Sequence, residues 1–334
     1  MQKQSPAVEW LYNPDLPFIR PDWLGNPFIN GRFYNNPVKE TIPLKYVLRW
    51  QFSPNPQRRE KRQEEYSVPV SPELPDLKGE DKLIWLGHSA FFIRLNGVNI
   101  LTDPCLFNIY SIRRHVGLPF PADYLRHIDY ILISHDHRDH LQLEALKILV
   151  RNNPDVQILM PLKGARLLKG KALRSVSVQE AGWYQRYKTD ERVSVVFLPA
   201  KHWGRRFLTD YNRTLWGSFH IKAGNKTLYF GGDTAFSSVF TDIQNVMGKS
   251  SYCLLPISAY APDYLMGPSH ANPEEAYEIF TMLKGEHFIP MHYGTYDLSN
   301  EPMGEPIRRL KARFAENGMS EKLDIPAVGE VFYL

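Results

Sequence analysis

Histidine and aspartate alternate densely in residues 135–140, which read His-Asp-His-Arg-Asp-His. Imidazole nitrogens and carboxylate oxygens are the donors that suit zinc and its first-row neighbours. The spacing lets His135 and His137 project together from one turn, while Asp139 and His140 point toward a second position beside it. The segment therefore predicts a loop that serves two metal ions. A solvated polar loop, in which the alternation is accidental, is the competing interpretation.

Metal-type side chains also follow other strands that the sequence predicts. Each closely follows a short apolar run: Asp103 follows residues 98–102, His202 follows 193–198, Asp233 follows 227–230, and His292 follows 288–291. Short apolar runs bounded by glycine and proline are typical of buried strands. Ligand sites in sheet proteins commonly lie outside one end of the strands, so we expect these side chains to gather along one edge of a sheet.

The elements that must position these residues form an α/β pattern from about residue 81 onward. Asn96-Gly97, between two apolar runs, is a strong signal for a two-residue hairpin. Apolar residues at positions 143, 146, 149 and 150 give one helical face just after the histidine-rich segment. A second helix is predicted to start within residues 272–275, Asn-Pro-Glu-Glu, which combine an N-cap, a proline at the first position and a capping box.

Residues 1–80 differ in composition and are rich in proline, asparagine and aromatic residues, with a charge run at 58–65. Apart from a short helix predicted at residues 44–52, periodicity is poor. We predict that residues 1–80 form an N-terminal arm whose aromatics cover a domain of residues 81–334. Tryptophan and tyrosine also favour membrane–water boundaries, so a membrane contact through Trp10 and Trp23 is the second hypothesis.

Composition narrows the class of protein. With 334 residues and 43% hydrophobic content, the chain is long enough for a proper core. The net charge of +4 is too small to imply a nucleic-acid partner, although it suits anionic substrates. Two cysteines, Cys105 and Cys253, argue against a disulfide scaffold. The start lacks the apolar core of a secretory signal, and no stretch approaches the roughly 20 apolar residues of a spanning helix. The expected location is the cytoplasm, with peripheral membrane contact as the alternative.

The candidate ligands occur along the chain in an order that resembles the signature of metallo-β-lactamase-fold hydrolases. This signature is H-x-H-x-D-H, followed by a single histidine, an aspartate and a last histidine. Within that superfamily the chain resembles the N-acylphosphatidylethanolamine-hydrolysing phospholipase D family. The resemblance runs from about Leu83 to the end of the chain. Its matching segments are residues 85–88, 101–104, 133–137, 215–218, 232–234, 270–276 and 292–295. It implies an αββα four-layer sandwich, here with an N-terminal extension, and a hydrolase domain at residues 81–334.

The expected ligand set follows from the number of donors. It assigns His135, His137 and His202 to one metal, Asp139, His140 and His292 to the other, and Asp233 as a bridge between them. Two zinc ions are expected, with iron or manganese as alternatives. Two cations about 3.5–4 Å apart can share a water and lower its pKa toward neutrality. Such a site suits the hydrolysis of phosphodiesters and esters.

The resemblance supplies the substrate class. It implies a phospholipase D-type phosphodiesterase that attacks N-acylphosphatidylethanolamine-like lipids with a metal-bridging hydroxide, releasing N-acylethanolamine and phosphatidic acid. Asp139, Asp233 and His270 are the residues expected to take part in catalysis. His270 precedes a helix N-cap, where it could bind the phosphate or protonate the leaving alkoxide. The sequence leaves a monomer and a homodimer open.

Other polar residues near these segments have weaker assignments. Asp103 is expected to hold the 135–140 loop through hydrogen bonds. His88 follows a strand, and the sequence leaves open whether it lines the site. The remaining histidines that we read as structural or surface residues are His115, His127, His220 and His287.

Three other functions compete with the phosphodiesterase hypothesis. A lactonase, or another ester or thioester hydrolase of the same fold, would use the same metals. An apolar acyl site for such a substrate could be formed by Trp203, Phe207, Tyr260 and Tyr264. A diiron redox protein is disfavoured because its motif typically carries glutamate where this chain has His137. A non-catalytic metal-binding module is disfavoured because the expected ligand set is complete.

Overall fold

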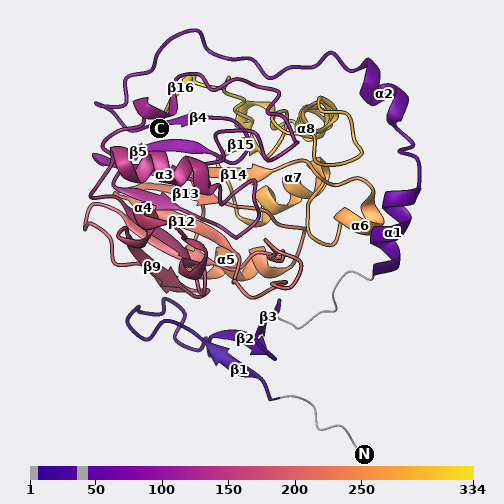
Figure 1. Cartoon of the computed structure of the whole chain (residues 1–334). Coiled ribbons are helices and arrows are strands. Elements are labelled where there is room, and N and C mark those ends of the chain that lie inside the picture. Colours follow the sequence, from indigo (N-terminus) through magenta and orange to yellow (C-terminus); the bar gives the residue numbers. More distant parts are fainter. Residues whose placement is uncertain (1–6, 36–43) are drawn as a thin grey trace, which may run out of the picture.

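Two mixed β-sheets pack face to face in the computed structural model, which describes residues 7–35 and 44–334 (Figure 1). The seven-stranded sheet has the order β16-β4-β5-β6-β7-β8-β9. Its strands are β4 (Lys82–Trp85), β5 (Phe91–Leu95), β6 (Val98–Thr102), β7 (Tyr130–Leu132), β8 (Gln157–Pro161), β9 (Ser177–Ala181) and β16 (Val331–Tyr333). Strands β6 to β9 pair in parallel, whereas β16, β4, β5 and β6 pair antiparallel.

The second sheet has six strands in the order in which they occur along the chain. They are β10 (Gln185–Arg186), β11 (Ser194–Leu198), β12 (Ser218–Ala223), β13 (Lys226–Phe230), β14 (Tyr252–Pro256) and β15 (His287–Met291). Here β13, β14 and β15 pair in parallel. Both sheets thus combine antiparallel strands on one side with parallel strands on the other.

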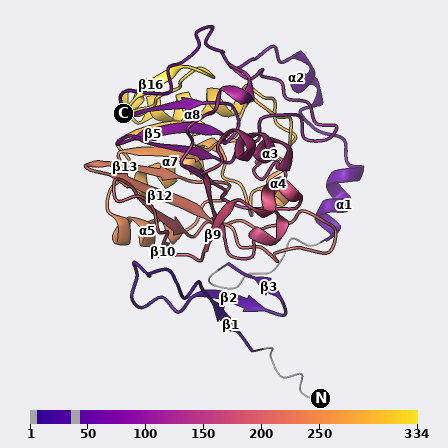
Figure 2. The ribbon, with the colours of Figure 1, turned by 60° about the vertical axis from the view of Figure 1, so that its left-hand side comes forward.

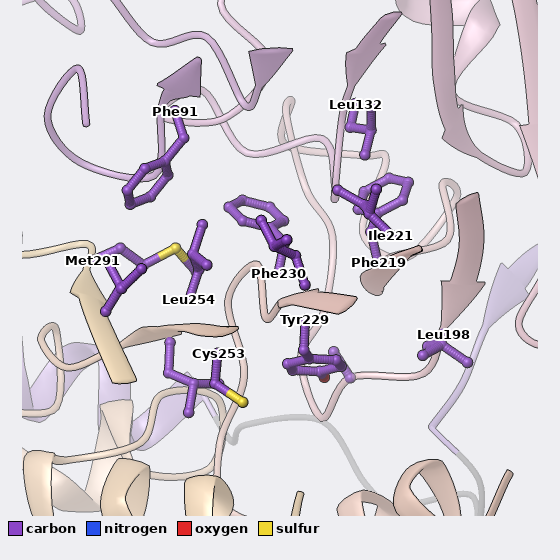
Figure 3. Close-up of a cluster of buried hydrophobic side chains, with 14 of the residues drawn as sticks. Phe91, Leu132, Leu198, Phe219, Ile221, Tyr229, Phe230, Cys253, Leu254 and Met291 are labelled. Atoms are coloured by element: carbon purple, nitrogen blue, oxygen red, sulfur yellow. The ribbon is translucent and has the colours of Figure 1, made fainter. Parts of the chain in front are cut away.

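The core between the sheets follows from the alternation of side chains along each strand. In β5, Phe91 and Ile93 face the second sheet, while Phe92 belongs to the cluster on the outer side. Figure 3 shows Phe91 and Leu132 from the first sheet opposite Phe230 and Leu254 from the second. Both faces of the central strands are therefore buried, which explains why those strands are nearly continuous apolar runs.

Helices cover the outer face of each sheet and complete the four layers. Helix α3 (Leu143–Asn152) and the short α4 (Lys171–Arg174) lie against the seven-stranded sheet (Figure 2). Helices α5 (Val239–Met247), α7 (Pro273–Met282) and α8 (Glu305–Glu316) lie on the other side (Figure 1). The predicted αββα sandwich is confirmed.

Local sequence signals account for several element ends. Asn96 and Gly97, with φ of 47° and 80°, form the tight turn between β5 and β6 that their sequence predicts. The capping box of α7 is present: Glu275 N–H donates to Asn272 Oδ1 at 2.9 Å, and Asn272 N–H donates to Glu275 Oε2 at 3.0 Å. Helix α3 buries Leu146, Leu149 and Val150, as its apolar spacing predicts.

The described part of the N-terminal region begins with a small sheet of β1 (Glu9–Leu11), β2 (Asn26–Ile29) and β3 (Arg32–Phe33). Trp23 packs against Trp183 and Tyr184, with ring centroids 6.4 and 4.8 Å apart, and Phe33 is fully buried. Aromatic residues of this region therefore cover part of the core.

Two helices and an extended segment continue from there to β4. Helix α1 (Leu44–Phe52) has the predicted bounds and contacts the short helix α6 (Asp263–Met266). Helix α2 (Arg58–Gln63) carries the charge run and buries no residue. Residues 1–6 and 36–43 of the predicted arm lie outside the described residues. In the described ranges, no helix combines the length and apolar character that crossing a bilayer requires.

Candidate metal centre

The predicted donors meet at one edge of the two sheets because each follows the end of a strand. The 135–140 loop follows β7, His202 follows β11, Asp233 follows β13 and His292 follows β15. One donor atom each of His135, His137, His202 and Asp233 lies within 4.8 Å of the others. Asp139, His140 and His292 form a second such group, which also includes His88. All seven donors predicted from the sequence are thus brought together.

Asp233 lies between the two groups. Its Oδ2 is 3.8 Å from Nε2 of both His135 and His202, and 3.2 Å from Nε2 of His140. Its Oδ1 is 3.1 Å from Nε2 of His292. Asp233 thus lies near histidines of both groups, which is the placement that a bridge requires. Although burial raises its pKa, His140 and His292 hold the pKa of Asp233 well below the usual range.

Asp103 fixes the 135–140 loop, as the sequence predicts. Its Oδ1 accepts the Ser134 N–H at 2.7 Å, and its Oδ2 accepts the Ser134 hydroxyl at 2.5 Å. The same Oδ2 lies 2.7 Å from Nδ1 of His140, and the Ser134 hydroxyl lies 2.9 Å from Nδ1 of His135. Both rings therefore direct Nε2 into the centre, which is how carboxylates commonly orient metal-binding histidines. His202 is oriented by a backbone carbonyl, with Nδ1 at 2.9 Å from Ser269 O.

The backbone of the centre is held in an unfavourable conformation at three positions. His88, Asp103 and His292 have φ of 55°, 31° and 63°, in the left-handed region that side chains with a Cβ rarely adopt. Such conformations persist only where surrounding contacts impose them, and they concentrate at functional sites.

The donor set fits a divalent metal. Buried polar atoms without a hydrogen-bond partner among the described residues include His140 Nε2, His292 Nε2 and Asp233 Oδ1. Leaving such atoms unpaired is costly, so a cluster of them facing a common centre needs an explanation. A bound cation satisfies them. Imidazole nitrogen and carboxylate oxygen are suited to zinc, iron and manganese.

His270 lies at the same centre, where its donor atom forms a further group with those of Asp233 and His292. Its Nδ1 is buried without a hydrogen-bond partner among the described residues and lies 3.9 Å from Asp233 Oδ2. Its ring centroid is 5.0 Å from that of His202. Burial lowers the pKa of His270 to about 4. The residue sits two positions before Asn272, the N-cap of α7, as the sequence predicts.

The aromatic residues considered for an acyl site divide into two pairs. Trp203 lies beside the centre, with its ring centroid 4.5 Å from that of His137, and Phe207 is half exposed beside Arg138. Tyr260 instead donates its hydroxyl to Glu305 at 2.7 Å, and Tyr264 packs against Tyr46 of α1. Only the first pair adjoins the metal-donor loop.

Arg206 is a contributor that sequence reasoning missed. This buried guanidinium donates from Nη1 to the carbonyl of Leu141 at 2.7 Å and to that of Asp136 at 3.2 Å. It therefore ties the two ends of the 135–140 loop together. Arg206 lies in an irregular segment, where no periodicity marks it. Ser134, by contrast, could have been recognised from its place directly before His135.

Comparisons with known proteins agree with this geometry. Residues 98–293 match the model of a family described as "Beta-lactamase superfamily domain". The chain is 30% identical over 321 residues to N-acyl-phosphatidylethanolamine-hydrolyzing phospholipase D 1 of Caenorhabditis elegans, covering 88% of this chain and 90% of the worm protein.

Two further relatives bear on sequence and on fold. The mitochondrial N-acyl-phosphatidylethanolamine-hydrolyzing phospholipase D of Saccharomyces cerevisiae is 32% identical over 258 residues, covering 74% of this chain. This chain spans about half, 54%, of the yeast protein. The solved structure of Igni18, a metallo hydrolase from Ignicoccus hospitalis, has a TM-score of 0.59 and 23% identity, covering 76% of this chain and 98% of Igni18. The last match concerns the fold alone.

Proposed function

Because the chain belongs to the beta-lactamase superfamily and is a metal-dependent hydrolase, we propose that it is a phospholipase D-type phosphodiesterase. Its substrates are N-acylphosphatidylethanolamine-like lipids, and its products are N-acylethanolamine and phosphatidic acid. The observation that carries the proposal is the placement of Asp233 between two groups of donors, in a chain that aligns with 90% of the worm phospholipase D.

We propose two zinc ions, with iron or manganese as alternatives that the same donors accept. His135, His137, His202 and Asp233 would hold the first ion. The second would be held by Asp139, His140 and His292, together with Asp233. When bound, two such ions lower the pKa of a water molecule and stabilise the charge that develops on the phosphate oxygens.

The residues of the chain supply orientation and proton handling. Asp139 and Asp233 hold the two groups of donors in their positions relative to each other. His270, whose buried Nδ1 has no hydrogen-bond partner in the described part of the chain, donates a hydrogen bond to a phosphate oxygen or to the leaving alkoxide. Its position just before the N-terminus of α7 places it where an anion is favoured.

The rim beside the 135–140 loop supports a lipid phosphate as the substrate. The guanidinium of Arg138 lies 4.6 Å from the ring centroid of Tyr110 and 5.4 Å from that of Phe207. Tyr110 and Leu208 are 76% and 94% exposed. A cation flanked by exposed apolar side chains suits a ligand that is both anionic and hydrophobic. This combination favours a phospholipid over a small polar ester.

We further propose that α1 brings the enzyme to the membrane surface from the cytoplasmic side. Its apolar residues Val47, Leu48 and Phe52 are 38%, 45% and 80% exposed, and Lys45 and Arg49 lie on the same helix. Trp50 anchors the helix through a hydrogen bond of 3.0 Å to Asn300. Basic helices with exposed apolar residues favour the interface of anionic membranes. Helix α1 contacts α6, which directly precedes the segment that carries His270.

A substrate panel tests the proposed reaction. Protein stripped by a chelator should be inactive, and zinc should restore hydrolysis of both bis(p-nitrophenyl) phosphate and N-acylphosphatidylethanolamine in vesicles. Lactones and thioesters should turn over poorly in the same assay. Efficient turnover of lactones or thioesters, with every phosphodiester inert, would establish the alternative ester-hydrolase function instead.

A further inference from the structure

His88 contacts Asp139 of the proposed second metal site but is not one of the seven ligands that the sequence predicts. The residue follows β4 and is 1% exposed. Its Nε2 lies 3.1 Å from Oδ2 of Asp139. We propose that His88 is a positioning residue, which donates a hydrogen bond to Asp139 and thereby holds this carboxylate in the second metal site. The proposal rests on the dinuclear centre proposed above.

The backbone fixes the His88 ring relative to the centre. The N–H of His88 donates to Thr295 Oγ1 at 2.8 Å, and its carbonyl accepts the N–H of His292 at 3.0 Å. The same carbonyl accepts the indole N–H of Trp85 at 2.9 Å. These bonds compensate for the left-handed conformation of His88, whose φ is 55°. His88 is therefore held directly against His292, one of the proposed ligands.

Asp139 Oδ2 lies among three imidazoles, and His88 is the nearest. The distances from this oxygen are 3.1 Å to His88 Nε2, 3.5 Å to His292 Nε2 and 3.6 Å to His140 Nε2. Only the first is typical of a hydrogen bond. A carboxylate oxygen can accept one hydrogen bond while it binds a cation, so His88 can orient Asp139 while the other two rings serve as ligands.

Direct ligation by His88 is the alternative, because its donor atom lies within 4.8 Å of those of Asp139, His140 and His292. The distance to Asp139 favours the positioning role, because Nε2 of His88 lies closer to this carboxylate than the ring of either proposed ligand does. A ring that carries its proton on Nε2 donates to Asp139 and leaves no N–H unpaired at Nδ1, which is buried without a partner among the described residues. The far nitrogens of His137 and His292 also lack a partner there, so the far nitrogen does not separate the two roles, and substitutions must do so.

Three substitutions separate the donor role from the ligand role. His88→Gln retains an amide N–H near the position of Nε2 but is a poor metal ligand. His88→Phe retains the ring volume without the donor. His88→Asn tolerates the left-handed backbone, but its amide is too short to reach Asp139. His287→Phe is the matched control. His287, on β15, also contacts a carboxylate, with Nδ1 at 2.9 Å from Asp324 Oδ2, but neither residue of this pair is a proposed ligand.

The measurement is the affinity of each zinc ion, from chelator competition combined with elemental analysis. We expect His88→Phe and His88→Asn to bind the second ion about 10–100-fold more weakly while retaining the first. His88→Gln should lie within a few-fold of the unmodified protein, and the control should match it. In an Asp139→Asn background, His88→Phe should cause no further loss of affinity.

Two results would overturn the proposal. Unchanged affinity for the second ion in both His88→Phe and His88→Asn would show that His88 does not hold Asp139. Equal weakening in His88→Gln would show that His88 is itself a ligand. Failure of the dinuclear centre is a separate result, because the unmodified protein would then bind one ion or none. If His88→Phe also loses the first ion through misfolding, the comparison of His88→Asn with His88→Gln decides.

Discussion

Oδ2 of Asp103 lies 2.7 Å from Nδ1 of His140, a residue 37 positions further along the chain. The same carboxylate accepts two hydrogen bonds from Ser134, so its removal leaves several buried donors unpaired. Asp103→Ala should lower the free energy of unfolding by about 3 kcal/mol and weaken metal binding. Denaturant unfolding and elemental analysis measure both effects. Asp123→Ala, at an exposed carboxylate, is the control and should leave stability nearly unchanged.

Asp233→Ala should be the most damaging change to metal content. The carboxylate lies near His135 and His202 of the first group and near His292 of the second, so both ions should lose a ligand together. Elemental analysis should give near two equivalents of metal for the unmodified protein and well below one for the variant. A variant that keeps one tightly bound ion would show that Asp233 does not bridge, and a single site in the unmodified protein would refute the dinuclear proposal.

His270→Ala should lower kcat while metal content stays unchanged. Loss of one donor that stabilises developing charge commonly costs roughly 10²–10³-fold in rate. Steady-state kinetics on bis(p-nitrophenyl) phosphate, with elemental analysis of the same sample, measures this effect. Loss of metal in the variant would instead make His270 a ligand or a structural support, since its Nδ1 lies 3.9 Å from Asp233 Oδ2.

Phe52→Ser combined with Leu48→Ser should raise the apparent KM for vesicle substrates and spare a small soluble diester. Both side chains are exposed on α1, so their loss removes apolar area without opening a cavity. Activity on the two diesters is the measurement. Trp23→Ala is the contrasting variant: because Trp23 packs against Trp183 and Tyr184, it should lower the melting temperature and reduce both activities alike. An unchanged KM for vesicles in the α1 variant would remove this helix from the membrane proposal.

His220, on β12, should make the protein sensitive to acid. Burial lowers the pKa of this imidazole to about 4, from an ordinary value of 6.5. The unfolded chain therefore takes up a proton below about pH 6.5, whereas the folded chain does not until about pH 4. The contribution of the neutral His220 to the free energy of unfolding is complete above the ordinary pKa of 6.5 and is lost as the pH falls toward about 4. Between about pH 7 and about pH 5, His220→Phe should lose about 2 kcal/mol less stability than the unmodified protein, measured by urea unfolding. An equal loss in both would contradict the assignment.

The donors were predictable because each signal is local. The dense 135–140 segment and the single His202, Asp233 and His292 all follow apolar runs, and strand ends meet at one edge of a sheet. The capping box of α7 is likewise contained within four adjacent residues.

What could not be predicted depends on contacts between distant segments. Arg206 reaches the 135–140 loop from an irregular stretch that has no periodic pattern. Trp23 has the composition of an interfacial residue, yet it packs onto Trp183, 160 positions later, because the β1–β3 sheet folds back onto the domain. The role of His88 depends on the placement of the 135–140 loop, which the sequence around His88 does not describe.

Because the backbone is left-handed at His88, Asp103 and His292, these three positions are poor choices for engineering new substrate specificity. Randomising these positions would yield mostly unfolded chains, because few residues other than glycine, asparagine and aspartate tolerate that conformation. Tyr110 and Phe207 are exposed beside Arg138 of the 135–140 loop, and Leu208 is the exposed neighbour of Phe207 in the chain. Of these three residues, only Tyr110, with φ of 52°, shares that constraint. Libraries that change acyl-chain or headgroup preference should therefore vary Phe207 and Leu208 first.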